Sequence, residues 1–167
     1  MDLLLIRHAD AAPKNVAARP IARDAVRLLD ASRPLTKHGR ARLWRTVHGL
    51  ERLSVSFDRI YHSPKLRSTE TADALSSLLH GETIVTRLLC APPGEALLRE
   101  IHGENVAVVG HQPYLGALLA LVVAGGIALR FGLEPSCVAW LRGDLRPGGM
   151  HVRALLSRRV LRALATR

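Results

Sequence analysis

The sequence predicts an α/β protein, a three-layer α/β/α sandwich with a mostly parallel central sheet. Short apolar runs alternate along the chain with amphipathic segments, which is the pattern of strands and the helices that cover them. Two runs, Leu3–Ile6 and Asn105–Gly110, are nearly all apolar, as strands buried on both faces are. The 167 residues suffice for one hydrophobic core, so we expect a single domain over residues 1–167.

The first strand is followed by a long connection and then a helix. Residues 9–34 are rich in Ala, Pro, Arg and Asp, which predicts an irregular surface segment with Arg33 as a loop anchor through ion pairs. A helix should begin after Thr36, which would cap it. Its apolar face would be formed by Leu43, Val47 and Leu50.

Two more strands and two more helices are predicted between residues 58 and 102. Asp58–His62 predicts a strand, and Ser63-Pro64 predicts the cap and first residue of a helix that runs to about Leu79. We expect Ser63 to be a cap rather than a phosphate ligand. Thr83–Thr86 predicts a short strand, and Gly94–His102 a short helix.

The C-terminal part begins with the strand at Asn105–Gly110. The segment Gly110-His111-Gln112-Pro113 leads into a core helix with one apolar face, formed by Leu115, Leu118, Leu119 and Val122. Two strands joined by a turn are then predicted, Ser136–Leu141 and Met150–Leu156. The last eleven residues predict a basic helix.

The chain is strongly basic, with 24 Lys and Arg against 14 Asp and Glu and a formal net charge of +10. Residues 1–70 hold 14 basic and 7 acidic side chains, and residues 142–167 hold 7 and 1. Such a surplus would attract a nucleic acid, an anionic membrane or an acidic phosphoprotein. Aromatic residues make up only 4%, which disfavours a nucleic-acid partner. The cluster Arg158, Arg159 and Arg162 favours a solvated helix face over an interaction site.

The cysteines and the apolar runs indicate a cytoplasmic protein that does not contact membranes. Cys90 and Cys137 lie in apolar surroundings, which predicts small buried residues rather than a disulfide. The N-terminal apolar run has four residues, whereas a signal-peptide core needs about 7–15. The longest apolar stretch, Leu115–Leu129, has 15 residues, whereas a membrane span needs about 20.

Polar side chains follow three of the predicted strands. Arg7 and His8 come after the first strand, Arg67 lies at the start of the helix after the second, and His111 follows the Val-rich strand. Because ligands bind where the carboxyl ends of parallel strands meet, we expect these four residues in one pocket. Arginine forks match phosphate oxygens, helix N-termini offer free N–H groups, and a neutral histidine can attack phosphorus.

Four motifs carry a resemblance to a known family. They are Arg7-His8-Ala9-Asp10-Ala11, Arg33-Pro-Leu-Thr36 with Gly39, Ser63-Pro64 with Leu66-Arg67 and Glu70-Thr71-Ala72, and Gly110-His111-Gln-Pro113. Their order resembles that of the histidine phosphatase (phosphoglycerate-mutase-like) superfamily, above all its short SixA-type phosphohistidine phosphatases, over roughly residues 1–156. Ala9 replaces the usual Gly, which is tolerable if its φ is negative.

The resemblance implies a phosphoglycerate-mutase-like fold and a metal-independent phosphatase without a cofactor. It makes His8 the nucleophile that is transiently phosphorylated, Arg7 and Arg67 the clamps on the phosphoryl oxygens, and His111 the fourth member of the pocket. The substrate would be a phosphohistidine-bearing protein, such as a phosphotransfer domain or a phosphocarrier. The other histidines show no metal-ligand spacing and are expected at the surface or in packing: His38, His48, His62, His80, His102 and His151.

The acid in the reaction bears on the substrate class. An alkyl phosphate expels an alkoxide that needs a proton, and larger members of the superfamily supply a Glu from a segment that here reads Arg87–Gly94, without an acid. A phosphohistidine can be protonated on its own ring, which favours that substrate. Asp10 and Glu95 stay open as acids. A small-molecule phosphomonoesterase and a non-catalytic phosphate- or nucleic-acid-binding module are the alternatives.

Overall fold

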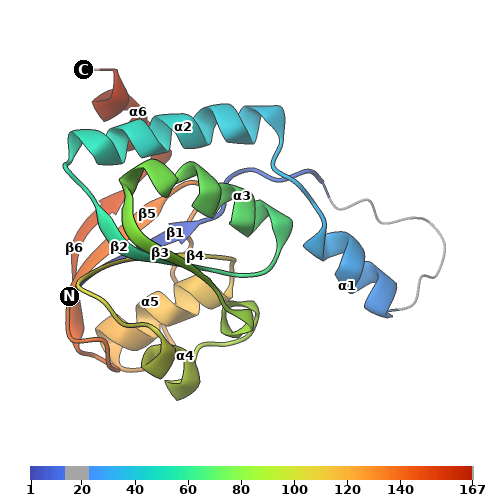
Figure 1. The fold of residues 1–167 in the computed structure, drawn as a ribbon. Coiled ribbons are helices and arrows are strands. Elements are labelled where there is room, and N and C mark those ends of the chain that lie inside the picture. The colour runs from blue at the N-terminus through green and yellow to red at the C-terminus, as the bar shows by residue number, and fades with distance from the viewer. Residues whose placement is uncertain (14–22, 167) are drawn as a thin grey trace.

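The protein forms a six-stranded sheet with helices on both faces (Figure 1). The computed structural model describes residues 1–13 and 23–166. The elements in chain order are β1 (Asp2–Arg7), α1 (Arg23–Ala31), α2 (Lys37–Arg52), β2 (Phe57–His62), α3 (Leu66–Ala74), the 3-10 turn η1 (Ser76–Leu78), β3 (Leu79–Val85), the 3-10 turn η2 (Arg87–Cys90), α4 (Glu95–Glu100), β4 (Asn105–Gly110), α5 (Tyr114–Ala124), β5 (Val138–Gly143), β6 (Met150–Leu156) and α6 (Arg158–Ala165).

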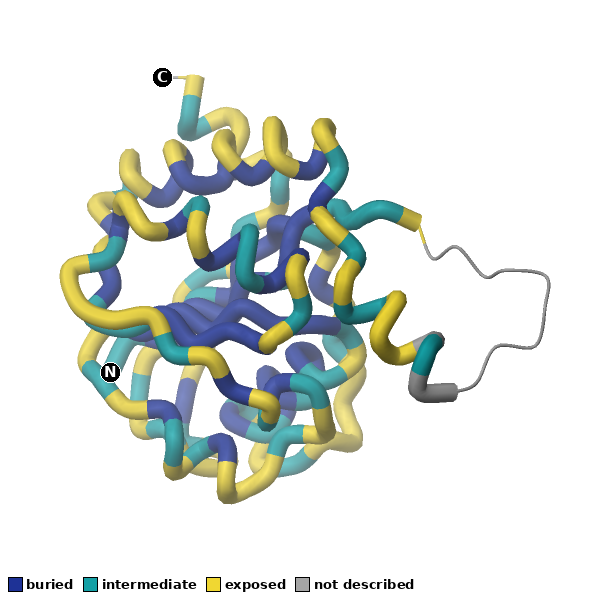
Figure 2. Tube along the Cα trace, turned by 45° about the vertical axis from the view of Figure 1, so that its right-hand side comes forward, coloured by how far each residue is buried: buried dark blue, intermediate teal, exposed yellow. Residues whose placement is uncertain are grey.

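Each face of the sheet has its own hydrophobic core. Because successive side chains of a strand point to opposite faces, β1 supplies Leu3 and Leu5 to one core and Leu4 and Ile6 to the other. The first core packs against α4 and α5, and the second against α2, α3 and α6. Figure 2 shows the buried strands between the two helical layers. The predicted fold class, a three-layer sandwich, is confirmed.

The order of the strands decides where the polar residues meet. The sheet runs β3-β2-β4-β1-β5-β6; the first four strands are parallel, β5 is antiparallel to β1, and β6 is antiparallel to β5. β4 therefore lies between β1 and β2 and pairs with both. Arg7 of β1 is opposite Gly110, and His62 of β2 is opposite Val109. The segments that follow β1, β2 and β4 lie together at one edge of the sheet. β6 runs in the same direction as β1, so α6 also begins at that edge.

Two predicted boundaries in the first half of the chain are wrong. Residues 9–34 were expected to be irregular, but α1 occupies Arg23–Ala31, and residues 14–22 lie outside the described part. The helix expected to start at Ser63-Pro64 and reach about Leu79 spans only Leu66–Ala74. It starts later because Ser63 bonds to another segment instead of capping α3, and it ends early because Leu79 pairs with Phe57 as the first residue of β3.

The strand predicted at Thr83–Thr86 is longer and begins at Leu79. β3 is the edge strand of the sheet and is mostly exposed, so it lacks the apolar run that marks the central strands. Its register with β2 shifts between Phe57 and Arg59. Gly81 lies near this irregularity, where a Cβ would come within 2.0 Å of the Asp58 carbonyl oxygen, so only glycine fits.

The remaining predicted elements are confirmed within a few residues. Thr36 caps α2 by accepting a hydrogen bond from the Gly39 N–H, and Ser157 caps the basic C-terminal helix in the same way through Val160. Cys137 is buried, as expected. Cys90 is only half-buried, because η2 ends at the rim of a cavity that this side chain lines. No helix among residues 1–13 and 23–166 has the length and apolarity to cross a membrane.

Candidate active site

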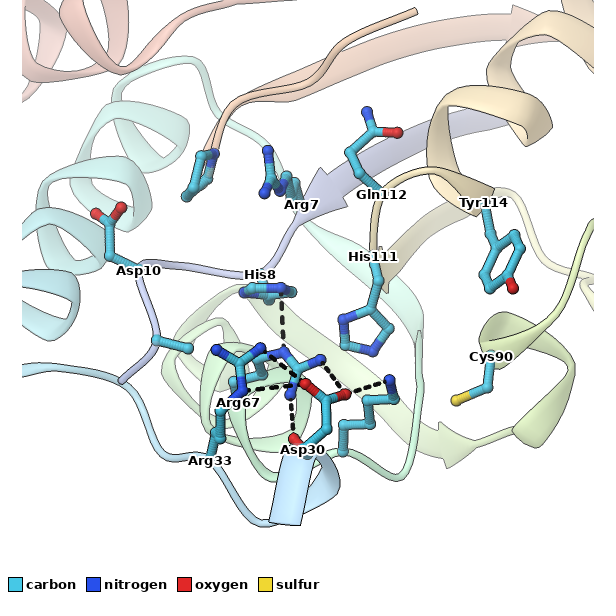
Figure 3. Close-up of a pocket in the computed structure, with 13 residues that line it drawn as sticks. Arg7, His8, Asp10, Asp30, Arg33, Arg67, Cys90, His111, Gln112 and Tyr114 are labelled. Atoms are coloured by element: carbon cyan, nitrogen blue, oxygen red, sulfur yellow. Dashed lines mark hydrogen bonds and ion pairs between the residues drawn. The ribbon is translucent and has the colours of Figure 1, made fainter. Parts of the chain in front are cut away.

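A cavity of about 380 Å³ opens at the carboxyl edge of the parallel strands (Figure 3). The structure brings all four predicted site residues to its wall: Arg7, His8, Arg67 and His111. Arg7 ends β1 and His8 follows it, Arg67 lies in the first turn of α3, and His111 stands between β4 and α5. Three strand ends that are distant in sequence therefore share one small volume.

The imidazole of His8 is held in one tautomer. Its Nδ1 is 2.7 Å from the Ala9 carbonyl oxygen, and because a carbonyl only accepts, Nδ1 carries the proton. Nε2 accepts a hydrogen bond from the Arg67 Nε–H at 3.2 Å. Burial, together with the charges of Arg67 and Arg7, lowers the pKa of His8 to about 4 despite the opposing hydrogen bond to Ala9. At neutral pH the ring is uncharged and Nε2 keeps a lone pair, as a nucleophile requires.

Ala9 occupies the position at which the histidine phosphatase superfamily usually has glycine, and the backbone there accepts alanine. Its φ is not positive, so the substitution strains nothing. The residue is fully buried, and its backbone N–H donates to the Thr71 hydroxyl at 3.2 Å. The Thr71 hydroxyl in turn donates to the Arg67 carbonyl at 2.7 Å. One side chain of α3 thus ties the His8 loop to the turn that carries Arg67.

Arg67 is buried and held by Asp30 on α1. Its Nη1 donates to the Asp30 backbone carbonyl at 2.6 Å, and its Nη2 lies 3.2 Å from the Asp30 carboxylate. The Lys65 ammonium pairs with the same carboxylate at 2.8 Å. Burial alone would raise the pKa of Asp30, but the hydrogen bond of Lys65 and the charges of Arg67 and Lys65 hold that pKa well below its usual value. Asp30 is therefore ionised and fixes the guanidinium beside His8.

Sequence reasoning missed Asp30 and Lys65. Asp30 fell inside the segment expected to be irregular, and its contact with Arg67 spans 37 residues. One signal was present: Asp30 and Arg33 lie three residues apart and form an ion pair at 3.0 Å. Arg33 also donates to the Ala12 carbonyl at 2.6 Å, which confirms it as a loop anchor, and it lines the cavity as well.

Within the described part of the chain, the Arg7 guanidinium has a hydrogen-bond partner for Nη1 but none for Nε. Its Nη1 donates to the Leu133 carbonyl at 2.7 Å, which orients the side chain along the cavity wall. Its Nε is buried and has no hydrogen-bond partner among the described residues. A buried donor without a partner is costly, and the same guanidinium lines a cavity in which an anion would find a charged partner.

His111 packs beside His8, with the ring centroids 4.9 Å apart. Its Nε2 bonds to the Ser63 hydroxyl oxygen, which also accepts a hydrogen bond from the Lys65 N–H at 3.4 Å. The Ser63 hydroxyl can donate to Nε2 or accept from it, so this bond allows either tautomer of His111, and Nδ1 is a buried atom without a partner in the described part of the chain. Burial and the neighbouring His8 and Arg67 lower the pKa of His111 to about 2, so the ring is neutral. Ser63 orients His111, which corrects its expected role as a cap.

The motif residues around the site are largely scaffold. Glu70 accepts a hydrogen bond from the Leu35 N–H and pairs with Arg40. The Ser68 hydroxyl donates to the Val109 carbonyl at 2.9 Å, which fastens α3 to β4. Gln112 donates to the Phe131 carbonyl at 3.1 Å. These contacts explain why several motif residues that surround Arg67 and His111 carry no reactive group into the cavity.

Neither candidate acid is placed as a free proton donor. Asp10 lines the cavity, but its Oδ2 pairs with Arg42 at 3.0 Å and with Arg158 at 3.6 Å. Glu95 pairs with Arg99 on α4, its side chain is 80% exposed, and it is not part of the cavity wall. Cations outnumber carboxylates on that wall, so the cavity suits an anion. Within residues 1–13 and 23–166 there is no cluster of three metal-ligating side chains.

Comparisons with known proteins agree with this arrangement. No protein-family model matches the chain. The chain is 29% identical over 150 residues to an uncharacterized protein of Picosynechococcus sp.. The aligned residues cover 85% of this chain and 85% of that protein. Among solved structures, it is similar to the protein histidine phosphatase SixA complexed with tungstate, with a TM-score of 0.73 and 26% identity over 96% of this chain and 99% of that one. It is also similar to the alpha-ribazole phosphatase from Shigella flexneri, with a TM-score of 0.65 and 20% identity over 95% and 97%.

A neutral histidine, two arginines and a second neutral histidine at the ends of parallel strands form a site that suits phosphoryl chemistry. The chain is similar in structure to phosphatases of the histidine phosphatase superfamily, which are hydrolases that need no metal.

Proposed function

We propose that the protein removes phosphoryl groups from histidine residues of a phosphoprotein through a phospho-His8 intermediate. The observation that carries this proposal is the neutral Nε2 of His8, which faces the Arg67 guanidinium in a cationic cavity that offers no free carboxylic acid. A histidine phosphotransfer domain or a phosphocarrier would fit as the substrate.

The first step transfers the phosphoryl group to the enzyme. The His8 Nε2 lone pair attacks phosphorus, and the bond from phosphorus to the substrate nitrogen breaks, with its electron pair leaving on that nitrogen. When the other nitrogen of the substrate ring carries a proton, the leaving group is a neutral imidazole and needs no acid from the enzyme. The Ala9 carbonyl keeps accepting the hydrogen bond from the His8 Nδ1–H. This acceptor stabilises the positive charge on the phosphorylated ring.

The second step returns the enzyme to its starting state. Water attacks phosphorus, the bond from phosphorus to His8 Nε2 breaks, and its electron pair returns to Nε2. The proton lost by the water goes to the phosphate, which leaves as orthophosphate. In both steps Arg7 and Arg67 donate to the equatorial oxygens, and His111 lies beside His8 as the fourth member of the pocket.

A small-molecule phosphomonoesterase is the second candidate. The likeness to the Shigella flexneri alpha-ribazole phosphatase favours it, since that protein is named for an ester substrate. The candidate acids speak against it, because Asp10 and Glu95 each form an ion pair with an arginine. Free phosphohistidine and a simple alkyl phosphate separate the two candidates, because only the alkyl phosphate requires an acid. We expect phosphohistidine to be hydrolysed at least about a hundredfold faster.

The His8→Ala variant tests the mechanism. It should lose essentially all phosphatase activity and take up no label from a ³²P-labelled phosphohistidine donor, whereas the wild type should form an acid-labile, base-stable phosphoenzyme. His80→Ala is the matched control, because His80 is an exposed histidine of β3 that does not line the cavity. Substantial turnover in His8→Ala would end the proposal.

A further inference from the structure

Arginines line a second cavity, of about 340 Å³, between α2 and α6. We call it the arginine groove. Its wall contains one acidic residue, Glu134, and one serine, Ser157. The five arginines of its wall come from two helices: Arg42 and Arg45 from α2, and Arg158, Arg159 and Arg162 from α6.

Most of the positive charge in the arginine groove is uncompensated. Arg158 pairs with Glu134 at 3.0 Å and with Asp10 at 3.6 Å, and Arg42 shares Asp10 at 3.0 Å. The other three arginines of the groove are exposed and have no carboxylate partner in the described part of the chain. The guanidinium groups that line this cavity carry like charges and repel one another, so an anionic partner would stabilise the groove.

The arginine groove adjoins the catalytic cavity. Asp10 lines the catalytic cavity while its carboxylate reaches the groove, and Figure 3 shows it at the margin of the site. The segment 133–135 separates the two cavities: Leu133 holds Arg7, Glu134 lines the groove, and Pro135 lines the catalytic cavity. This closeness follows from the topology, because β6 ends at the same edge as β1 and α6 begins there.

We propose that the arginine groove docks an acidic surface of the phosphoprotein while the phosphohistidine enters the catalytic cavity. The inference rests on the proposed function and adds how a protein substrate is selected. A small phosphate ester fills only the catalytic cavity and gains nothing from the groove. Charge complementarity of this kind raises the association rate and lowers KM, with little effect on the turnover of bound substrate.

An acidic protein suits the groove better than a nucleic acid does. No aromatic side chain is among the residues that line it, so bases would find no stacking surface. The sequence showed only the arginines of α6 and favoured a solvated helix face. The fold places Arg42 and Arg45 opposite them, and this second row of arginines turns a charged helix face into a groove.

The test compares three phosphohistidine substrates. They are an acidic peptide with one phosphohistidine flanked by Asp and Glu, a neutral counterpart with Asn and Gln at those positions, and free phosphohistidine. The variant is Arg159→Glu/Arg162→Glu, which spares the Asp10 and Glu134 ion pairs. The control is Arg52→Glu/Arg146→Glu, which changes the net charge equally at exposed positions outside both cavities.

We expect the wild type to prefer the acidic peptide, with kcat/KM at least about tenfold above that of the neutral peptide at low salt. The groove variant should lose this preference, mainly through KM, while its kcat/KM for free phosphohistidine changes less than about twofold. The control should keep the preference, and salt at about 0.5 M should abolish it in every protein that shows it. Orthophosphate release followed by ³¹P NMR gives the rates.

Three outcomes would overturn the docking proposal. The first is an equal kcat/KM of the wild type for the acidic and the neutral peptide. The second is an equal loss of preference in the control and in the groove variant. The third is a single-stranded oligonucleotide that binds more tightly than the acidic peptide and loses this binding in the groove variant. Fluorescence anisotropy of the unphosphorylated acidic peptide measures groove binding without catalysis. Failure to release phosphate from all three substrates would instead contradict the proposed function, and the anisotropy would still decide the groove.

Discussion

The hydrogen bond from Arg67 to His8 occupies the lone pair that attacks phosphorus in the proposed mechanism. An incoming phosphoryl group therefore has to take over the Arg67 Nε–H as its own hydrogen bond before Nε2 is free. The guanidinium stays in place during this exchange because Asp30 holds it through two other nitrogens. At the scale of single residues, the position of Arg67 depends on the Asp30 carboxylate and backbone carbonyl.

Replacing Asp30 with Asn should loosen Arg67 without emptying the space. The amide keeps one acceptor but loses the charge that attracts Arg67 and Lys65, so we expect kcat/KM for phosphohistidine to fall on the order of tenfold to a hundredfold. Steady-state kinetics measure this, with Asp73→Asn, an exposed site on α3, as the control. Wild-type kinetics in Asp30→Asn would show that the backbone carbonyl of Asp30 alone positions Arg67.

Stability should fall in mild acid because two histidines are buried in the neutral form. Folding lowers the pKa of His8 to about 4, from an ordinary value of about 6.5. The unfolded chain therefore binds protons first, and the stabilisation present above pH 6.5 is lost as the pH falls through 6.5 towards 4. Urea unfolding at pH 7.5 and pH 5 measures the loss. His8→Gln cannot titrate there and should show a smaller loss, and an equal loss in both proteins would contradict this assignment.

At the scale of elements, the N-terminus of α2 supports the loop that carries His8. The Thr36 N–H donates to the Asp10 carbonyl at 2.9 Å, and Gly39 packs against the same carbonyl so closely that a Cβ would lie 2.2 Å from its oxygen. The helix cap and the active-site loop thus form one unit. This close approach explains the glycine of the second motif.

Gly39→Ala should destabilise the protein although alanine normally favours helices. In an open helix interior the change would add about 1 kcal/mol, but here the new methyl group must push α2 away from the His8 loop, at a cost of about 1–3 kcal/mol. Urea unfolding together with kcat reports both effects. Gly132→Ala is the control because its Cβ would meet nothing within 4 Å. A more stable Gly39→Ala protein would mean that the loop shifts freely.

The elements that could be predicted are those whose burial shows in the sequence. β1 and β4 are buried over most of their length and appear as apolar runs. α1 and β3 were misjudged because they lie at the surface, where Leu28 and Val85 are exposed and no periodic pattern is required. The strand-end residues Arg7, His8, Arg67 and His111 followed from the predicted parallel sheet. Asp30 and Ser63 did not, because only the fold brings them to Arg67 and His111.

At the scale of the whole molecule, the two hydrophobic cores support different parts of the surface. The core under α4 and α5 lies on the face away from the arginine groove, whereas the core under α2, α3 and α6 also positions that groove. Leu161 of α6 is fully buried in the second core, and α6 packs so closely on α2 that a Cβ at Gly49 would meet the Leu161 backbone. The attachment of α6 therefore depends on one leucine.

Leu161→Ala should cost about 2–5 kcal/mol of unfolding free energy, because it leaves a cavity between α2 and α6. Urea denaturation measures the loss, and Leu155→Ala, at a side chain that is 58% exposed, should cost far less. At urea concentrations below its unfolding transition, the Leu161→Ala protein should still hydrolyse free phosphohistidine. The reason is that the catalytic cavity is built on elements other than α6. A loss under 0.5 kcal/mol would show that α6 is not anchored through this residue.

The proposed nucleophile, His8, and the residue that holds Arg67, Asp30, stand on parts of the fold that we expect to open at very different free-energy cost. His8 follows β1, which lies between β4 and β5 and whose amide protons should exchange with solvent only on global unfolding. Asp30 stands on α1, where Leu28 is 71% and Leu29 52% exposed, and its polar contacts with Arg67 and Lys65 connect this helix to the site. On warming, the enzyme should lose the alignment of Arg67 before it loses His8. Thermal inactivation would then precede the melting of the sheet.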